Sequence, residues 1–457
     1  MIESETPSAF RDRPVNIDES GQQKWIYAKQ PKGKWYQRRT AVAWLAISFL
    51  VLAPFLKING NPLMLFDIAN RRFSIFGQII WAQDSYLLAL IMVITVVFIV
   101  LFTVIYGRLW CGWICPQTIF LEMVFRRIEY LFEGNYRNGR HQKEVTSRII
   151  FLRIAKHITF LITSILIANV FLNWFIGPER LFEIITAPVS ENWLGFTFML
   201  GISLFYYWIY AFFREQVCTM ICPYGRMQGV LMDSRSIAVI YDYKRGEPRG
   251  PKSTGDCINC HQCIAVCPTG IDIKDGSQLE CINCTACIDE CNIVMKRINK
   301  PENLIRFDSF QGIENGKRSI LNGRTYAYSA VLVILIIALS VMVMNRKPIE
   351  ATILRVPGTI FQQIDSVNYS NLFLVKIINK TQLDKNLEIR LLNPKQGKLQ
   401  LTTGQTTLKS QGTLESVLIV NLNHEALTGK STPVELGIYE GETLLEVYTT
   451  NFLGPNK

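Results

Sequence analysis

Two cysteine runs of identical spacing are the feature that most constrains this chain. The spacing C-x2-C-x2-C-x3-C occurs first with a proline, Pro268, directly after its last cysteine, and it recurs thirteen residues later. In two-cluster ferredoxins of this spacing, three thiolates of one run and the last cysteine of the other hold each cubane. We therefore predict two [4Fe-4S] clusters, one on Cys257, Cys260, Cys263 and Cys291 and the other on Cys281, Cys284, Cys287 and Cys267.

Structural zinc is the alternative, because C-x2-C pairs commonly hold that metal. A duplicated run of four cysteines favours clusters over zinc. Asn292 stands where a proline often follows the second run, and this leaves ligation unaffected because sulfur supplies the bond. Metal spacings of this kind indicate a compartment in which thiols stay reduced.

The chain is more apolar than a soluble protein of its length. Hydrophobic residues make up 49% of its 457 residues, and five stretches come close to the roughly 17 to 25 residues that cross a bilayer. We predict spans at 41–58, 86–106, 154–175, 193–213 and 326–344. The net charge of +11 is spread beside these stretches rather than gathered in one stripe, so we expect a membrane surface and no nucleic acid as partner.

Basic residues alternate in density between the connecting segments. Eight Lys and Arg precede the first predicted span, whereas 57–85 holds only Lys57, Arg71 and Arg72. Because positive flanks stay in the cytoplasm, we expect the N-terminus and the cysteine runs to be cytoplasmic and the C-terminal part to be periplasmic. The first 39 residues show no signal peptide.

The C-terminal part alternates apolar and polar residues in short runs separated by turn residues. These runs cover 372–378, 387–392, 398–402, 416–422, 434–439 and 444–450. About seven strands in such a length predict an immunoglobulin-like β-sandwich, here without a cysteine pair. The predicted architecture is a multi-domain membrane protein: a cytoplasmic tail at 1–39, four transmembrane helices at 40–245, a ferredoxin-like segment with two clusters at 246–325, a fifth transmembrane helix at 326–345 and the periplasmic sandwich at 346–457.

Two further cysteine pairs, each followed by proline, come directly after the second and fourth predicted spans. They are Cys111 with Cys115 and Cys218 with Cys222. If a helix continued through each pair, sulfurs at i and i+4 would share one face and could bind one soft metal. Nearby arginines would favour thiolates; they are Arg108, Arg126, Arg127, Arg214 and Arg226.

The alternative for these pairs is that free cysteines pack as small hydrophobic residues at helix ends. The recurrence of one motif at two equivalent positions favours a redox or metal role. The sequence leaves open whether the four thiols form one site or two. Transmembrane haem b is disfavoured, because among four histidines only His157 lies at membrane depth, and the amphipathic stretch 121–134 is expected along the membrane surface.

Three stretches resemble a known family. They are GRLWCGWICPQTIF at 107–120, REQVCTMICPYGRMQG at 214–229 and CPTGIDIKDGSQLECINCTACIDEC at 267–291, with RRFSIFG from Arg71 as a further match. Together they are similar to the CcoG family, also called FixG or RdxA, over nearly the whole chain. This resemblance implies an accessory protein of the bacterial inner membrane that serves assembly of cbb3-type cytochrome oxidase.

The same resemblance implies an oxidoreductase that reduces Cu(II) to Cu(I), with copper as substrate at Cys111, Cys115, Cys218 and Cys222. The partners that it implies are cbb3-type oxidase subunits or copper chaperones and transporters, and we also expect an electron donor of unknown identity and a second copy of the chain. Copper is chemically coherent with these residues because Cu(I) prefers thiolate and thioether ligands. Two alternatives stay open: a quinol dehydrogenase relay resembling NapH-like subunits, and a redox-sensing assembly scaffold.

Overall fold

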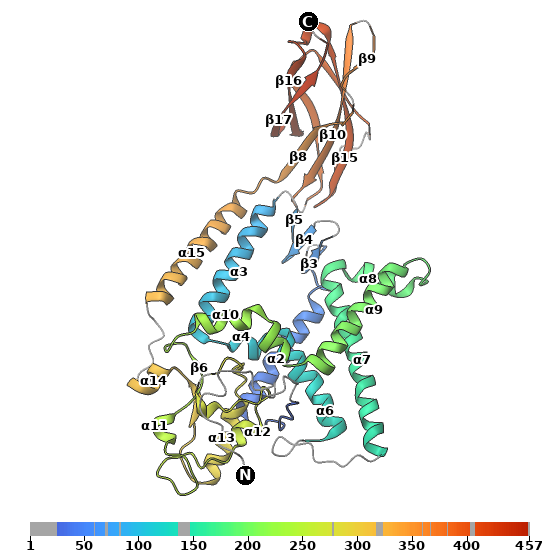
Figure 1. Cartoon of the computed structure of the whole chain (residues 1–457). Helices are drawn as coiled ribbons and strands as arrows, with labels where there is room; N and C mark the ends of the chain where they lie inside the picture. Colours follow the sequence, from blue (N-terminus) through green and yellow to red (C-terminus); the bar gives the residue numbers. More distant parts are fainter. Residues whose placement is uncertain are drawn as a thin grey trace. The chain divides into compact units, whose positions relative to one another are not determined.

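The computed structural model describes residues 25–58, 60–68, 72–81, 84–135, 147–276, 278–316, 323–358, 360–365, 367–381, 383–402 and 407–455. The chain divides after Leu339 into two compact units. Figure 1 gives the element labels. Most of the predicted tail, residues 1–24, and Arg71 of the family motif lie outside the described residues.

Four helices of the described residues are long and apolar enough to cross a membrane. They are α3 (Ser85–Tyr106), α7 (Ser147–Ile176), α9 with its π-helical extension η3 (Trp193–Phe213), and α15 (Gly323–Met344). The helix α3 holds no charged residue. It ends at Tyr106 because the next residue, Gly107, has a φ of 54°, which breaks the helical path. The helix α7 packs along α9 (Figure 1). This chain is therefore a membrane protein.

The first predicted span differs from the helix that the structure contains. The helix α2 begins at Lys34 and ends at Leu52, and its first turns carry Arg38 and Arg39. Its 19 residues are long enough for a span but less apolar than those of the other four helices. Pro54 explains the early end, because proline lacks an amide donor and disfavours helix in the residue before it. A fifth span stays a prediction.

Between α2 and α3 the chain forms short antiparallel strands. The strands β1 (Lys57–Ile58) and β2 (Asn61–Pro62) pair with each other, and β3 (Met64–Asp67), β4 (Arg72–Ile75) and β5 (Gln78–Trp81) form a sheet in chain order. The helix α8 (Pro178–Thr186) follows α7 after Gly177.

Short helices follow α3 and α9 and carry the two cysteine pairs. After α3 come α4 (Leu109–Trp113), α5 (Pro116–Phe120), the π-helix η2 (Leu121–Phe125) and α6 (Arg126–Glu133); after α9 and η3 come the π-helix η4 (Val217–Ile221) and α10 (Pro223–Leu231). Within the stretch expected along the membrane surface, Phe125 and Arg126 are buried and Leu131 is exposed, and its place at the membrane stays a prediction. The charge of Arg126 is compensated by the carboxylates of Glu122 and Glu215, as described below.

The two cysteine runs lie between the paired strands β6 (Ala238–Tyr241) and β7 (Ile305–Asp308). The helices of this segment are α11 (Tyr243–Gly246), α12 (Gln262–Ala265), η5 (Ile273–Asp275), α13 (Ala286–Arg297) and α14 (Phe310–Asn315). Val239, Ile271, Ile288 and Leu304 pack together with cysteines of both runs. The core of this segment is therefore built around the cysteines.

The second unit is a β-sandwich. One sheet has the order β13-β15-β10-β8 with β9 also on β10, and the other has the order β12-β16-β17. Its strands are β8 (Ile349–Arg355), β9 (Gln362–Gln363), β10 (Asn368–Asn379), β11 (Lys385–Asn386), β12 (Glu388–Asn393), β13 (Gly397–Leu401), β14 (Thr407–Leu408), β15 (Thr413–Asn423), β16 (Ser431–Glu440) and β17 (Thr443–Leu453), with the short helix η6 (His424–Ala426).

The core of the sandwich confirms the predicted alternation. Phe373, Val375 and Ile377 of β10 are buried together with Val420 of β15 and Leu436 of β16. In antiparallel strands, alternate side chains face the same side, so these positions meet between the two sheets.

Candidate functional site

Both cysteine runs fold into the same turn. The residues Asn259 and His261 of the first run and Asn283 and Thr285 of the second have φ between 53° and 67°. Asparagine tolerates this left-handed region, whereas β-branched Thr285 is uncommon there. Backbone strain of this kind concentrates at functional sites. The repeated turn therefore marks both runs as built for ligation.

The cysteines line two separate cavities. One is lined by Cys257, Cys260, Cys263 and Cys291. The other is lined by Cys267, Cys281, Cys284 and Cys287, with Cys263 also on its wall. Each cavity thus has three cysteines of one run and the last cysteine of the other, which is the grouping that crosswise ligation needs.

The donor sets fit a cubane better than single ions. Among the described residues, no three His, Cys, Asp or Glu side chains converge closely enough to hold one metal ion. Burial raises the pKa of Cys281 and of Cys291 to about 12 and that of Cys284 to about 11. A bound metal deprotonates such a thiol outright, so dry thiols of this kind suit an iron-sulfur cluster.

The two C-x3-C-P motifs do not form continuous helices. The helix α4 ends at Trp113 and Cys115 is extended, with ψ of 122°, while Cys222 has ψ of 111°. The condition under which sulfurs at i and i+4 would share one helical face is therefore not met. The physical reason is the following proline, which disfavours helix in the residue before it and begins a new helix, α5 or α10.

The four thiols of these motifs nevertheless gather in one place. Burial is the main cause that raises the pKa of Cys111 to about 11 and that of Cys218 to about 12, and the neighbouring thiols of the group add to both shifts. The Sγ atom of Cys111 lies 3.4 Å from Nε2 of Gln228, and that of Cys218 lies 3.9 Å from Oγ1 of Thr118. We call Cys111, Cys115, Cys218 and Cys222 the thiol group.

The arginines that were expected to favour thiolates are mostly engaged elsewhere. Arg214 binds Glu129 through two bonds of 2.6 and 2.9 Å, and Arg126 pairs with Glu122 and Glu215. These pairs are buried and neutralise the arginines locally. Arg108 remains beside Cys111, and its charge opposes the rise in the pKa of that thiol without overcoming burial.

The thiol group lies directly beside the second cysteine run. Cys111 packs against a buried group that contains Ile282 and Cys284. The indole of Trp113 donates to the carbonyl oxygen of Asn283 at 3.2 Å, and a Cβ atom on Gly112 would stand 2.2 Å from the carbonyl oxygen of Ile282. The helix α4 therefore joins the thiol group to the second cysteine cavity.

The roles of other side chains at the site could not be predicted from the sequence. Gln228 and Thr118 contact thiols of the group, and Arg39 donates to the carbonyl oxygen of Gly112 at 2.7 Å. His157 lies away from these contacts; its Nδ1 atom is 3.0 Å from the hydroxyl of Tyr207. The structure gives His157 a hydrogen-bonding role within the helices.

Protein-family models match three parts of the chain. A 4Fe-4S dicluster domain matches residues 213–254 and 247–310, and a 4Fe-4S binding domain matches residues 88–137. The IG-like fold at the C-terminal of FixG matches residues 339–455. The iron-sulfur matches include both C-x3-C-P motifs as well as the two cysteine runs. An iron-sulfur protein with an immunoglobulin-like domain is thus established.

Curated relatives match over most of the chain. Protein RdxA of Cereibacter sphaeroides is 31% identical over 391 residues, which are 80% of this chain and 81% of the relative. Protein RdxB of the same organism is 30% identical over 78% of this chain and 79% of its own. Nitrogen fixation protein FixG of Rhizobium meliloti is 31% identical over 67% of this chain and 60% of its own. With these similarities added to its cysteine cavities and its C-terminal sandwich, the chain belongs to the FixG/RdxA family.

Proposed function

We propose that this protein passes electrons from two [4Fe-4S] clusters to Cu(II), and that it serves the assembly of a cbb3-type cytochrome oxidase. The observation that carries the proposal is the thiol group packed against the second cysteine cavity. Soft thiolate ligands prefer Cu(I) over Cu(II), so binding favours the reduced ion. The thiol group is the proposed copper site, with two thiolates on the ion at a time, since no three of its thiols converge on one point.

Each residue set has a distinct role in this proposal. Cys257, Cys260, Cys263 and Cys291 hold one cluster, and Cys267, Cys281, Cys284 and Cys287 hold the other. A [4Fe-4S] cluster supplies one-electron redox chemistry. In the thiol group, Gln228 orients Cys111 and Thr118 orients Cys218. One electron converts one Cu(II) into one Cu(I), and the thiolates then retain the product.

The arrangement in the membrane follows from charge. The positive-inside rule supports an inner-membrane protein with a cytoplasmic N-terminus and cysteine runs and a periplasmic sandwich. This proposal includes domain boundaries at 40, 246, 326 and 346. It also includes a fifth span near α2. Oxidase subunits, copper chaperones or transporters are the proposed partners, together with a second copy of the chain.

The proposal is tested with a variant in which Cys111, Cys115, Cys218 and Cys222 are all serine. Purified under anaerobic conditions, this variant should keep the iron and the EPR signals of both clusters. After reduction with dithionite and removal of the excess, its rate of Cu(I) formation from Cu(II) should fall by about tenfold or more, as expected when a ligand set is lost. Ile221→Val, at an exposed apolar position within the second motif, is the matched control and should behave as wild type.

Two outcomes would contradict the proposal. An unchanged rate of Cu(I) formation in the quadruple variant would separate copper reduction from the thiol group. Full oxidase assembly in cells whose protein carries serine at the eight cluster cysteines would instead favour the scaffold function, in which electron transfer has no part.

A further inference from the structure

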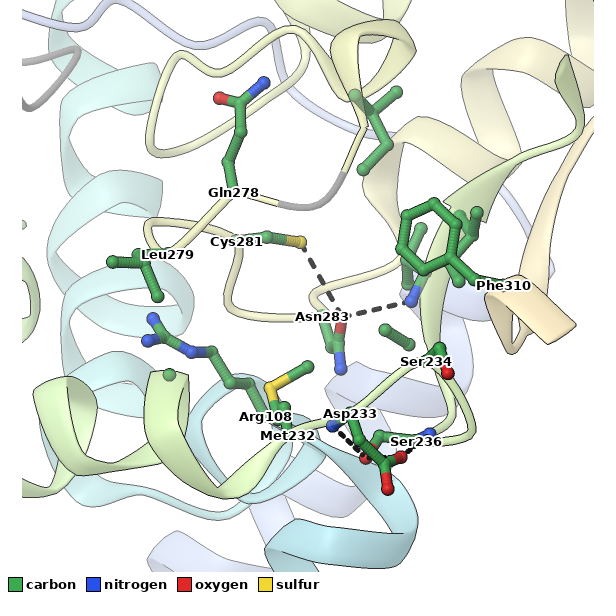
Figure 2. Close-up of a pocket in the computed structure, with 15 residues that line it drawn as sticks. Arg108, Met232, Asp233, Ser234, Ser236, Gln278, Leu279, Cys281, Asn283 and Phe310 are labelled. Carbon is green, nitrogen blue, oxygen red and sulfur yellow. Dashed lines mark hydrogen bonds between the residues drawn. The ribbon is translucent and has the colours of Figure 1, made fainter. Parts of the chain in front are cut away.

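A cavity of about 360 Å³ lies on the side of the second cysteine run, with Cys281 in its wall. Figure 2 shows Arg108, Met232 and Asn283 around the same space as Cys281. Ligand sites in proteins have volumes of about 300 to 1,000 Å³. The cavity therefore suits one small molecule beside a proposed cluster ligand.

A buried donor in this wall has no partner. The Oδ1 atom of Asn283 accepts the amide of Val239 at 3.1 Å, which fixes the orientation of the side-chain amide. Asn283 is only 2% exposed, and its buried Nδ2 atom has no hydrogen-bond partner among the described residues. Leaving such a donor unpaired costs about 1 to 3 kcal/mol. A ligand oxygen in the cavity would remove this cost.

The other walls combine charge with apolar surface. Arg108 lines the cavity, and its guanidinium favours an oxygen that carries negative charge. Met232, Ile240, Leu279 and Phe310 provide apolar walls. These groups match a flat apolar ring that carries oxygen atoms.

The cavity lies at the end of a membrane-crossing helix. Ser236 lines the cavity, and its hydroxyl donates to the carbonyl oxygen of Val104 in the last turn of α3, at 2.7 Å. Val230 at the end of α10 is 85% exposed and Leu279 on the cavity wall is 60% exposed. Exposed apolar side chains at this level suit a ligand that arrives from lipid rather than from water.

We propose that this cavity binds a membrane hydroquinone, which is the electron donor of the protein. This inference rests on the proposed function, since it names the source of the electrons that reach copper. A hydroquinone becomes a quinone by losing two electrons and two protons. The electrons pass one at a time to the oxidised clusters on the two cysteine sets and leave as two Cu(I). The two protons pass to water.

Three variants test the site in the full-length protein. Asn283→Asp keeps the acceptor for Val239 and removes the Nδ2 donor, and aspartate tolerates the φ of 53° at this position. Ser234→Trp fills the cavity from an exposed rim residue. Arg235→Trp places the same ring on the neighbouring exposed residue, which does not line the cavity, and is the matched control.

Binding is measured without turnover, by fluorescence quenching of the redox-inert quinol analogue heptyl-hydroxyquinoline N-oxide. We expect saturable binding to wild type and to Arg235→Trp, and an affinity weaker by about tenfold or more in the other two variants, as for loss of one good contact. The rate of cluster reduction by menadiol is followed by visible absorbance. It should fall in Asn283→Asp and Ser234→Trp and stay at the wild-type value in Arg235→Trp. Iron content and cluster potentials are measured in each variant as a check on folding and on the added charge.

The results also separate this inference from the proposed function. With dithionite as reductant, Ser234→Trp and Arg235→Trp should both reduce Cu(II) at the wild-type rate. Failure of copper reduction with intact quinol binding would overturn the copper function alone. Absence of saturable binding to wild type, or equal affinity in Ser234→Trp, would overturn the quinol site. The quinol site would also be overturned if reduced FMN reduced the clusters and menadiol did not.

Discussion

Gly112 lies where α4, which carries Cys111, approaches the second cysteine run. A Cβ atom there would stand 2.2 Å from the backbone oxygen of Ile282, which cannot move aside as a flexible side chain can. We predict that Gly112→Ala pushes α4 from this loop, lowers the free energy of unfolding by about 1 to 3 kcal/mol and reduces the cluster content.

The measurement is the iron content per chain together with the thermal midpoint in detergent. Gly201→Ala in α9 is the matched control, because a Cβ atom there meets nothing within 4 Å. Equal loss of iron in both variants would show that the close approach at Gly112 has no importance.

At the residue scale, the sequence predicted the grouping of the cysteines better than it predicted their neighbours. The cysteine spacing predicted which residues line each cavity, because the ligands of one run lie within a few residues of one another. Asn283 and Gln228 gave no signal. Their roles arise from contacts with Val239 and Cys111, and the second of these spans 117 residues of sequence. Only the folded chain brings such pairs together.

At the scale of elements, α2 is anchored on the cysteine segment through Asp289 of α13. Its carboxylate accepts the backbone amides of Trp35 at 3.2 Å and of Tyr36 at 2.8 Å, two donors that the first turn of a helix leaves unpaired. Asp289→Ala should lower the free energy of unfolding by about 1 to 2 kcal/mol, as for the loss of a helix cap.

Thermal unfolding followed by tryptophan fluorescence measures this effect. Glu302→Ala is the control, because its pair with Lys296 is exposed and exposed pairs contribute little. If both variants unfold together with wild type, α2 is not held by Asp289.

Helix ends were the elements that sequence predicted least well. The prediction continued the first span to 58, whereas α2 ends at Leu52, before Pro54. The sequence left open whether a helix continues through each C-x3-C motif, and in the structure neither motif is one continuous helix. The strand β8 (Ile349–Arg355) was missed because it lies close behind the apolar run of α15, although its buried residues Ile349, Ala351 and Ile353 do alternate with polar ones. The long apolar helices and the alternating strands were predicted correctly, since each is dictated by its own periodicity.

At the scale of the whole molecule, the core of the sandwich is drawn from residues of the second unit alone. Phe373 in β10 is fully buried, whereas the next residue, Leu374, is 45% exposed. Phe373→Ala should lower the free energy of unfolding of the sandwich by about 3 to 5 kcal/mol, and Leu374→Ala should have little effect. Both should retain the visible spectrum of the clusters, whose proposed ligands all lie in the first unit.

Limited proteolysis measures the sandwich and visible absorbance measures the clusters, in the same samples. Loss of cluster absorbance in Phe373→Ala in step with cleavage of the sandwich would contradict the independence of the two cores.

The central claim is that electrons from the two clusters held by the cysteine runs reach copper through the thiol group. Its most direct test is to reduce the purified protein, remove the reductant, add Cu(II) under anaerobic conditions, and follow cluster reoxidation and Cu(I) formation together. The account predicts equal rates and one Cu(I) for each electron that the clusters lose, with both processes slowed in the quadruple serine variant. Cu(I) that forms while the clusters stay reduced, or clusters that reoxidise without forming Cu(I), would contradict it.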